Sequence, residues 1–277
     1  MPTKKRGISP VISTVILFST IMVIMVGVLG YASSIFQIQS EWAEFSNAKD
    51  TTYNLAEIIE DVSLKPGAQS YVRYNPRSGG PNFVENVGAF DLRVNTTVLI
   101  NGAVNVFSYR GGDLVGTSDE VLRGNPENLI IYGNVAPLGA VNVTQRDGAT
   151  IFLDFNRVGV IRIGMSNFSR GMIGSSILWE PVEIIQVNMI NLTFGGGGGS
   201  GPVSLIASNS KVIQNVYRIS DPYPSIRRNY TLYVQATFQG RTEQLPIRII
   251  EPVGITKYDT IFIVCISNVR LNFLGGE

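Results

Sequence analysis

The first forty residues of the chain are dominated by one long apolar segment. No residue from Gly7 to Ser40 carries a charge, and the stretch from Ile8 to Tyr31 is almost entirely apolar. About 20 consecutive apolar residues are enough for a helix to cross the hydrocarbon core of a membrane. The pattern therefore predicts a helix that inserts into a membrane.

Residues 41–64 change to a one-sided pattern. Their apolar positions recur three, four or seven residues apart, at Trp42, Phe45, Thr52, Leu55, Ile59 and Val62. Charged residues fill the other faces, and Lys65-Pro66-Gly67 ends the helix. We expect a single helix over residues 8–64, roughly 85 Å long at 1.5 Å per residue. Its part 8–40 is a membrane or polymer core, and its amphipathic part 41–64 packs against the rest of the chain.

From residue 68 onward, short β-branched and aromatic runs alternate with glycine, asparagine and proline. This pattern predicts a β-rich domain over residues 68–277, with short strands such as 97–100, 104–109, 203–207 and 212–219. Turns are expected at Asn101-Gly102, Gly111-Gly112 and Asp147-Gly148. The fold class is therefore α+β: a long N-terminal hydrophobic helix followed by a large antiparallel β-sandwich-type domain. One sandwich or two smaller ones both fit.

Composition removes several classes of function. The 277 residues include 22 basic and 21 acidic ones, a net charge of +1, which favours no nucleic-acid partner. Histidine is missing altogether, so the usual general base and zinc ligand are missing too. Cys265 is the only cysteine, which excludes an intrachain disulfide, and we expect it to be a small buried hydrophobe. We expect no enzyme, no cofactor and no metal.

The remaining candidates for chemistry are weak. Carboxylates lie together at Asp113, at Asp119 with Glu120, and at Glu180 with Glu183, in no spacing that specifies catalysis. We interpret them as solvated loop charges, with a weak calcium site near Asp113 to Glu120 as the alternative. The run Gly195 to Gly201 lacks the lysine and the following helix of a phosphate loop, which favours a flexible hairpin loop or a subdomain linker.

One group of aromatic and basic residues allows two interpretations. It comprises Tyr217, Tyr223, Tyr230, Tyr233, Arg218, Arg227 and Arg228. A patch that binds sugars or a surface would use such residues, and ordinary aromatic positions in strands explain them equally well.

The residues before the apolar segment indicate its orientation. Lys4, Lys5 and Arg6 should stay on the cytoplasmic side, which places everything after residue 40 outside the cell. Ala32-Ser33-Ser34 is a candidate site for ordinary signal cleavage, but the apolar run is longer than an ordinary signal peptide. A cut before the helix, which then stays attached to the protein, fits better.

Lys5-Arg6-Gly7 followed by Ile8-Ser9-Pro10-Val11-Ile12 resembles the class III signal of archaeal type IV pilin-like proteins. The resemblance covers about thirty residues, and it implies that a prepilin-type signal peptidase cuts between Gly7 and Ile8. Ile12 stands where bacterial pilins carry a glutamate, in agreement with the archaeal pattern. Archaellins have a similar basic leader and cleavage site, but their mature chains favour glycine and threonine near the N-terminus. A pilin-like protein is therefore the better fit.

The resemblance also implies how the protein works. After processing at Lys5, Arg6, Gly7 and Ile8, copies of the chain would assemble through the helix into an adhesive surface filament. The assembly and membrane residues would be Pro10, Val11, Ile12, Val15, Ile16, Phe18, Ile21, Val23, Ile24 and Val26. Expected partners are its own copies, the peptidase, a pilus assembly ATPase with its membrane platform, and membrane lipid before assembly. The alternative is a membrane-anchored extracellular β-sandwich receptor or an archaellum component.

Five Asn-x-Ser/Thr sequences are candidate N-glycosylation sites in an exported protein. They lie at Asn95, Asn142, Asn167, Asn191 and Asn229.

Overall fold

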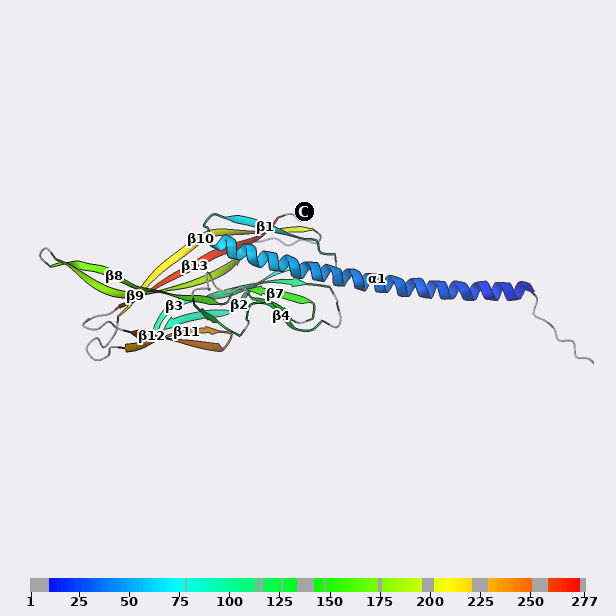
Figure 1. Ribbon diagram of the computed structural model, residues 1–277. Helices are drawn as coiled ribbons and strands as arrows, with labels where there is room; N and C mark the ends of the chain where they lie inside the picture. The colour runs from blue at the N-terminus through cyan, green and yellow to red at the C-terminus, as the bar shows by residue number, and fades with distance from the viewer. Residues whose placement is uncertain are drawn as a thin grey trace, which may run out of the picture.

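The computed structural model describes residues 10–77, 79–112, 114, 117–125, 127–133, 142–146, 148–173, 176–195, 202–220, 229–250 and 259–274. Within these ranges, the side chains of 142, 170–180, 220, 229–230 and 250 are not described. One helix, α1 (Pro10–Ser63), is followed by a strand-rich region. Figure 1 shows the second half of α1 lying along this region while the first half projects away from it.

The described strands form two sheets. The six-stranded sheet has the order β1-β10-β13-β9-β8-β5, and the seven-stranded sheet has the order β12-β11-β2-β3-β7-β6-β4. The strands of the first sheet are β1 (Gln69–Tyr74), β5 (Ile130–Tyr132), β8 (Val158–Ile173), β9 (Ser176–Phe194), β10 (Val203–Ser220) and β13 (Asp259–Leu274). Those of the second are β2 (Gly80–Val94), β3 (Thr97–Arg110), β4 (Glu120–Arg123), β6 (Asn142–Arg146), β7 (Thr150–Asp154), β11 (Asn229–Phe238) and β12 (Arg241–Ile250).

The predicted fold class is confirmed, with one refinement. Most neighbouring strands are antiparallel, but β9 with β13 and β5 with β8 are parallel pairs. The parallel pairing of β9 and β13 runs from Val182 opposite Asp259 to Phe194 opposite Leu271. Such pairing joins segments far apart in the sequence, which local turn signals do not report.

The strand-rich region is one sandwich with two consecutive cores. The first core packs the helix against one end of both sheets, and the second fills the other end. Strands β3, β9 and β13 contribute buried side chains to both cores. The two cores are therefore connected through these three strands.

Several predicted strands merge into longer ones, and the predicted turn at Asn101-Gly102 is wrong. Both residues lie inside β3, opposite Asp91 and Phe90 of β2. The hairpin turns instead at Asn95 and Thr96, where Asn95 adopts a φ of 51°. Asparagine tolerates this conformation better than most residues. Tyr233 of β11 fixes the turn, since its backbone donates to Asn95 Oδ1 and accepts from the Asn95 N–H, both at 3.0 Å.

The other two predicted turns have different outcomes. Gly148, with a φ of 77°, lies in the short connection between β6 and β7, whose ends Arg146 and Thr150 are paired. Asp147 lies outside the described residues. Gly111 and Gly112 follow β3 but form no hairpin with β4, because β4 pairs with β6. Strands β9 and β10, on either side of the glycine-rich run, are separated in the sheet by β13, so a hairpin there is excluded. Residues 196–201 of that run lie outside the described residues.

The amphipathic half of α1 buries one face against the first core. Its buried residues are Phe45, Ala48, Thr52, Leu55, Ala56, Ile59, Val62 and Ser63. Each large apolar side chain buried in this way contributes about 1.5–3 kcal/mol. Trp42, predicted on the same face, is instead 41% exposed, because the packed face begins only at Phe45.

Gly111 makes the close approach of Phe45 possible. A Cβ atom at position 111 would lie 2.4 Å from Cδ2 of the Phe45 ring, and the Gly111 N–H donates to the Ala149 carbonyl at 2.7 Å. Phe45 itself is only 1% exposed. The Gly111 backbone is held by its hydrogen bond and the Phe45 ring is enclosed by the core. Neither can therefore move to make room for a side chain at position 111.

We predict that Gly111→Ala lowers the free energy of unfolding by about 1–3 kcal/mol, the usual cost of overpacking a core. The measurement is urea unfolding of the full chain in detergent, followed by circular dichroism. Gly102→Ala is the matched control, because nothing lies within 4 Å of a Cβ atom there. Equal stability of the two variants would show that the Phe45 contact does not constrain the fold.

Candidate functional site: the projecting apolar helix

The first half of α1 has no partner among the described residues. All ten residues predicted for membrane insertion and assembly lie in α1 and are exposed. Among the nine large apolar ones, exposure ranges from 46% at Ile21 to 73% at Val23. The helix is long and apolar enough to cross a membrane, and none of its most apolar window is buried inside the molecule.

Three hydroxyl groups of this half donate back to the helix backbone. Thr14 Oγ1 donates to the Val11 carbonyl at 2.9 Å, Thr20 Oγ1 to the Ile16 carbonyl and Ser34 Oγ to the Tyr31 carbonyl, both at 2.8 Å. The backbone N–H groups are bonded along the helix as well. The backbone of this half can therefore enter lipid or an apolar bundle with its hydrogen bonds intact.

Polar contacts hold the second half of α1 to the sandwich at the edges of its buried face. Glu44 Oε1 accepts from the Arg77 backbone N–H at 2.9 Å and from the Tyr109 hydroxyl at 3.2 Å. Burial raises the pKa of Tyr109, and the nearby Glu44 charge raises it further. The phenol is therefore protonated at any ordinary pH and is available as the donor.

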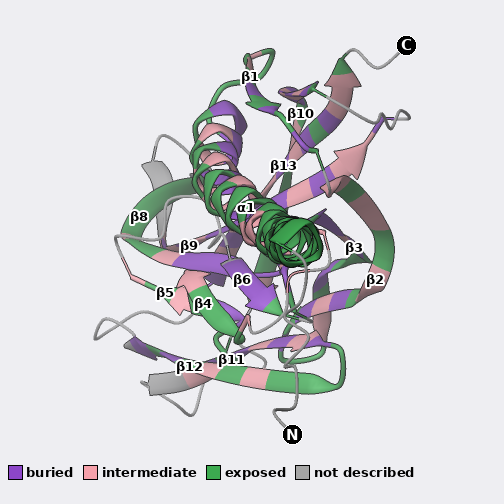
Figure 2. Ribbon diagram, turned by 90° about the vertical axis from the view of Figure 1, so that its right-hand side faces the viewer, coloured by how far each residue is buried: buried purple, intermediate pink, exposed green. Residues whose placement is uncertain are grey.

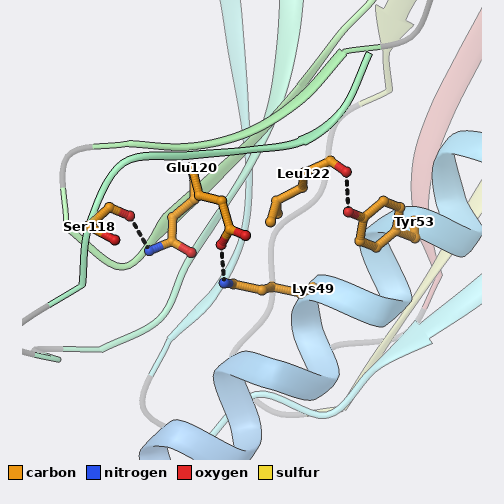
Figure 3. A network of polar contacts seen from close by, with 6 residues as sticks. Lys49, Tyr53, Ser118, Glu120 and Leu122 are labelled. Atoms are coloured by element: carbon orange, nitrogen blue, oxygen red, sulfur yellow. Dashed lines mark hydrogen bonds and ion pairs between the residues drawn. The ribbon is translucent and has the colours of Figure 1, made fainter. Parts of the chain in front are cut away.

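Strand β4 provides the second set of contacts, and Figure 3 shows those of Lys49 and Tyr53 from close by. Lys49 Nζ lies 3.3 Å from Glu120 Oε2, and the Tyr53 hydroxyl donates to the Leu122 carbonyl. Arg123 Nη2 lies 2.8 Å from Glu60 Oε2. Since such partly exposed ion pairs are worth only about 0–1 kcal/mol each, they set the orientation of the helix more than its stability.

The C-terminal end of α1 is capped by residues from distant strands. Asn209 Nδ2 of β10 donates to the carbonyls of Val62 and Ser63, at 3.2 and 3.0 Å. Ser267 Oγ of β13 donates to the Ser63 carbonyl at 3.0 Å. The last carbonyls of a helix lack partners within its regular ladder, so these side chains add to the local bond from the Lys65 N–H to the Val62 carbonyl, at 3.1 Å. Sequence reasoning missed Asn209, because no local pattern links it to the helix.

The processing residues Lys5, Arg6, Gly7 and Ile8 lie outside the described residues. The first described residue is Pro10, which is also the first residue of α1. Proline suits the first turn of a helix, because its missing N–H would have no partner there.

The five candidate glycosylation sites differ in accessibility. Asn95 in the β2–β3 turn and Asn167 in β8 are exposed. Asn191 of β9 is half-buried, and its Nδ2 atom donates to Asn268 Oδ1 at 2.8 Å. The side chains of Asn142 and Asn229 are not described.

The predicted aromatic and basic patch is only partly described. The Tyr217 hydroxyl donates to the Leu99 carbonyl at 3.1 Å, and Arg218 forms an ion pair with Asp259. These two side chains therefore serve internal contacts, while Tyr233 is exposed. Tyr223, Arg227 and Arg228 lie outside the described residues, as does the side chain of Tyr230.

The remaining candidates are spread over the fold. In the part of the chain that the structure describes, no three His, Cys, Asp or Glu side chains are grouped so as to hold a metal ion. Glu120 pairs with Lys49, Glu183 is fully buried and pairs with Arg162, and Asp113 lies outside the described residues. Cys265 is half-buried in β13 rather than buried as expected, and burial still raises the pKa of its thiol. The raised pKa favours the unreactive thiol form.

Comparison with known proteins yields no match. No protein-family model, no curated protein and no solved structure is similar to the chain. Functional inference therefore rests on the residues and on their geometry.

We predict that Asn209→Asp destabilises the protein by about 1–3 kcal/mol, because two hydrogen bonds are lost and a negative charge faces the carbonyl end of a helix. The same environment raises the folded-state pKa of the new carboxyl above its unfolded value. The loss is therefore largest at neutral pH and shrinks as pH falls through that folded pKa.

The measurement is urea unfolding of the full chain at neutral and acidic pH. Ser210→Asp is the matched control, since the neighbouring Ser210 is exposed and its hydroxyl contacts only the Asn268 carbonyl, at a long 3.4 Å. Similar losses in both variants would contradict the capping role of Asn209.

We predict that glycans occur at Asn95 and Asn167 in the protein isolated from its natural host, and that Asn191 carries none. A glycan at Asn95 leaves Oδ1 free to keep its contact with Tyr233, whereas Asn191 is half-buried and its Nδ2 atom, the point of attachment, is held against Asn268. Glycopeptide mass spectrometry measures the occupancy of each site. A modified Asn191 beside unmodified Asn95 and Asn167 would contradict this prediction.

Proposed function

We propose that this protein is a structural subunit of an archaeal type IV pilus-like surface filament. It is trimmed after Gly7 and assembles with other copies through the first half of α1. The observation that carries the proposal is the division of one helix into a half that the chain's own sandwich covers and a half that it leaves exposed.

The exposed half needs an apolar environment. Burial of one large apolar side chain is worth about 1.5–3 kcal/mol, and at least nine such side chains of this half are exposed. Lipid covers them before assembly, and the same segments of neighbouring copies cover them in a filament. Because the backbone hydrogen bonds lie within the helix, moving it from lipid to a bundle leaves them intact.

The basic residues Lys4, Lys5 and Arg6 support the orientation and the processing step. They hold the leader at the cytoplasmic face, where a prepilin-type peptidase reaches the bond after Gly7, and the sandwich lies outside the cell. An assembly ATPase with its membrane platform then extracts the trimmed helix from lipid. The sandwich is displayed on the outside of the filament, where we propose that it serves adhesion.

The test combines N-terminal mass spectrometry with electron microscopy of sheared surface material. The expected result is a chain that begins at Ile8 and is recovered in filaments. Gly7→Leu should abolish trimming and filaments, because a bulky side chain replaces the small residue at the cut. Thr3→Leu is the matched control in the same leader, and it should leave both unchanged.

The alternative predicts a different result in the same experiment. A permanent membrane anchor carrying a receptor domain would keep Met1, stay in the membrane fraction and be indifferent to Gly7→Leu. That result would overturn the filament proposal.

A further inference from the structure

A cavity of about 310 Å³ lies in the sandwich, away from the projecting helix half. Residues of β4, of β6 and of the β11–β12 turn line it, together with the segment that follows β7. Figure 2 draws β11 and β12 near the bottom of the domain, with β4 and β6 above them. The rim of the cavity includes the exposed residues Arg146 and Gln239, and the floor of the cavity consists of buried residues.

The floor contains polar atoms whose hydrogen-bonding capacity is unused. They are Thr144 Oγ1, Gln145 Oε1, Asn156 Oδ1 and Arg157 Nη1, which have no hydrogen-bond partner among the described residues. Each of these side chains belongs to a residue that is at most 9% exposed. Buried polar atoms are normally paired, and each unpaired one costs about 1–3 kcal/mol. Such a group, beside a cavity, indicates a polar occupant.

Arg157 is the residue of the cavity floor that most needs a hydrogen-bond partner, because its guanidinium is buried. It is 1% exposed, and Nε donates to the Asn128 carbonyl at 2.5 Å. Nη1 lies 3.7 Å from Asp154 Oδ1, which is too far for a direct hydrogen bond. Burial lowers the pKa of Arg157, and the Asp154 charge opposes this effect. A hydroxyl group on the cavity side of this pair can bridge it, because it can accept from the guanidinium and donate to the carboxylate.

The charges around the cavity argue against an ionic occupant. Arg146, Arg157 and Arg241 line it, and so do Asp119, Glu120 and Asp154. The formal charges of these six side chains cancel, so an anion and a cation would each meet as much repulsion as attraction. Both donors and acceptors are present, as a ligand rich in hydroxyl groups requires.

We infer that this cavity binds a neutral saccharide unit. Its volume falls at the lower end of the range for small-molecule sites, about 300–1,000 Å³, and far exceeds the roughly 30 Å³ share of one water molecule. Val106, Leu129 and Phe238 give it an apolar wall for the C–H face of a sugar ring. The inference goes beyond the proposed filament function and does not depend on it, because either a subunit or a receptor could carry such a site.

The test titrates the full chain, solubilised in a detergent without a sugar headgroup, with glucose, galactose, mannose and N-acetylglucosamine. Sodium sulfate is the ionic comparison, and isothermal calorimetry or saturation-transfer NMR measures binding. Wild-type protein should bind at least one sugar and not sulfate. Arg157→Gln should weaken sugar binding at least tenfold, because the floor loses its buried donor.

Rim variants keep the inference testable if Arg157→Gln does not fold. Arg146→Ala and Gln239→Ala change exposed side chains at the mouth, and each should weaken binding several-fold. Arg248→Ala is the matched control, an exposed arginine of β12 outside the cavity. Absence of sugar binding by the wild type, binding of sulfate alone, or equal binding by the rim and control variants would each overturn the inference.

Discussion

The structure depends on the contact between residues 45–63 of α1 and one end of both sheets. The two halves of this helix differ in the apolar surface that must be buried. The second half has one apolar face, whereas the first half is apolar on all sides. The sandwich buries only the apolar face of the second half. Had it covered the whole helix, no apolar surface would remain for lipid or for other copies. The length of the buried face therefore decides what the molecule can associate with.

This contact is built from segments that are far apart in the sequence. Phe45 fits against Gly111, Glu44 joins Arg77 and Tyr109, and the helix ends against Asn209 and Ser267. The helix is thus tied to β10 and β13 of one sheet and to β3 and β4 of the other. Loss of any one contact leaves the others in place.

Sequence patterns predicted the elements that depend on local or periodic signals. The apolar run, the one-sided stripe and the break at Lys65-Pro66-Gly67 were enough to predict the helix, which spans Pro10–Ser63. The patterns failed where tertiary contacts override local preference: Asn101-Gly102 lies within β3 because β2 pairs with it, and Trp42 is exposed because the sandwich ends at Phe45. Neither the cap from Asn209 nor the cavity around Arg157 leaves a local signal, since their residues are brought together only by the sheets.

Strand β4 links the two regions to which we assign functions. Glu120 pairs with Lys49 of the helix and also lines the cavity. In the same strand, the Leu122 carbonyl accepts from Tyr53, and Arg123 pairs with Glu60. The strand is only four residues long and pairs with β6, which supplies Thr144 and Gln145 to the cavity floor. A shift of the helix against the sandwich would thus be transmitted through β4 to one wall of the cavity.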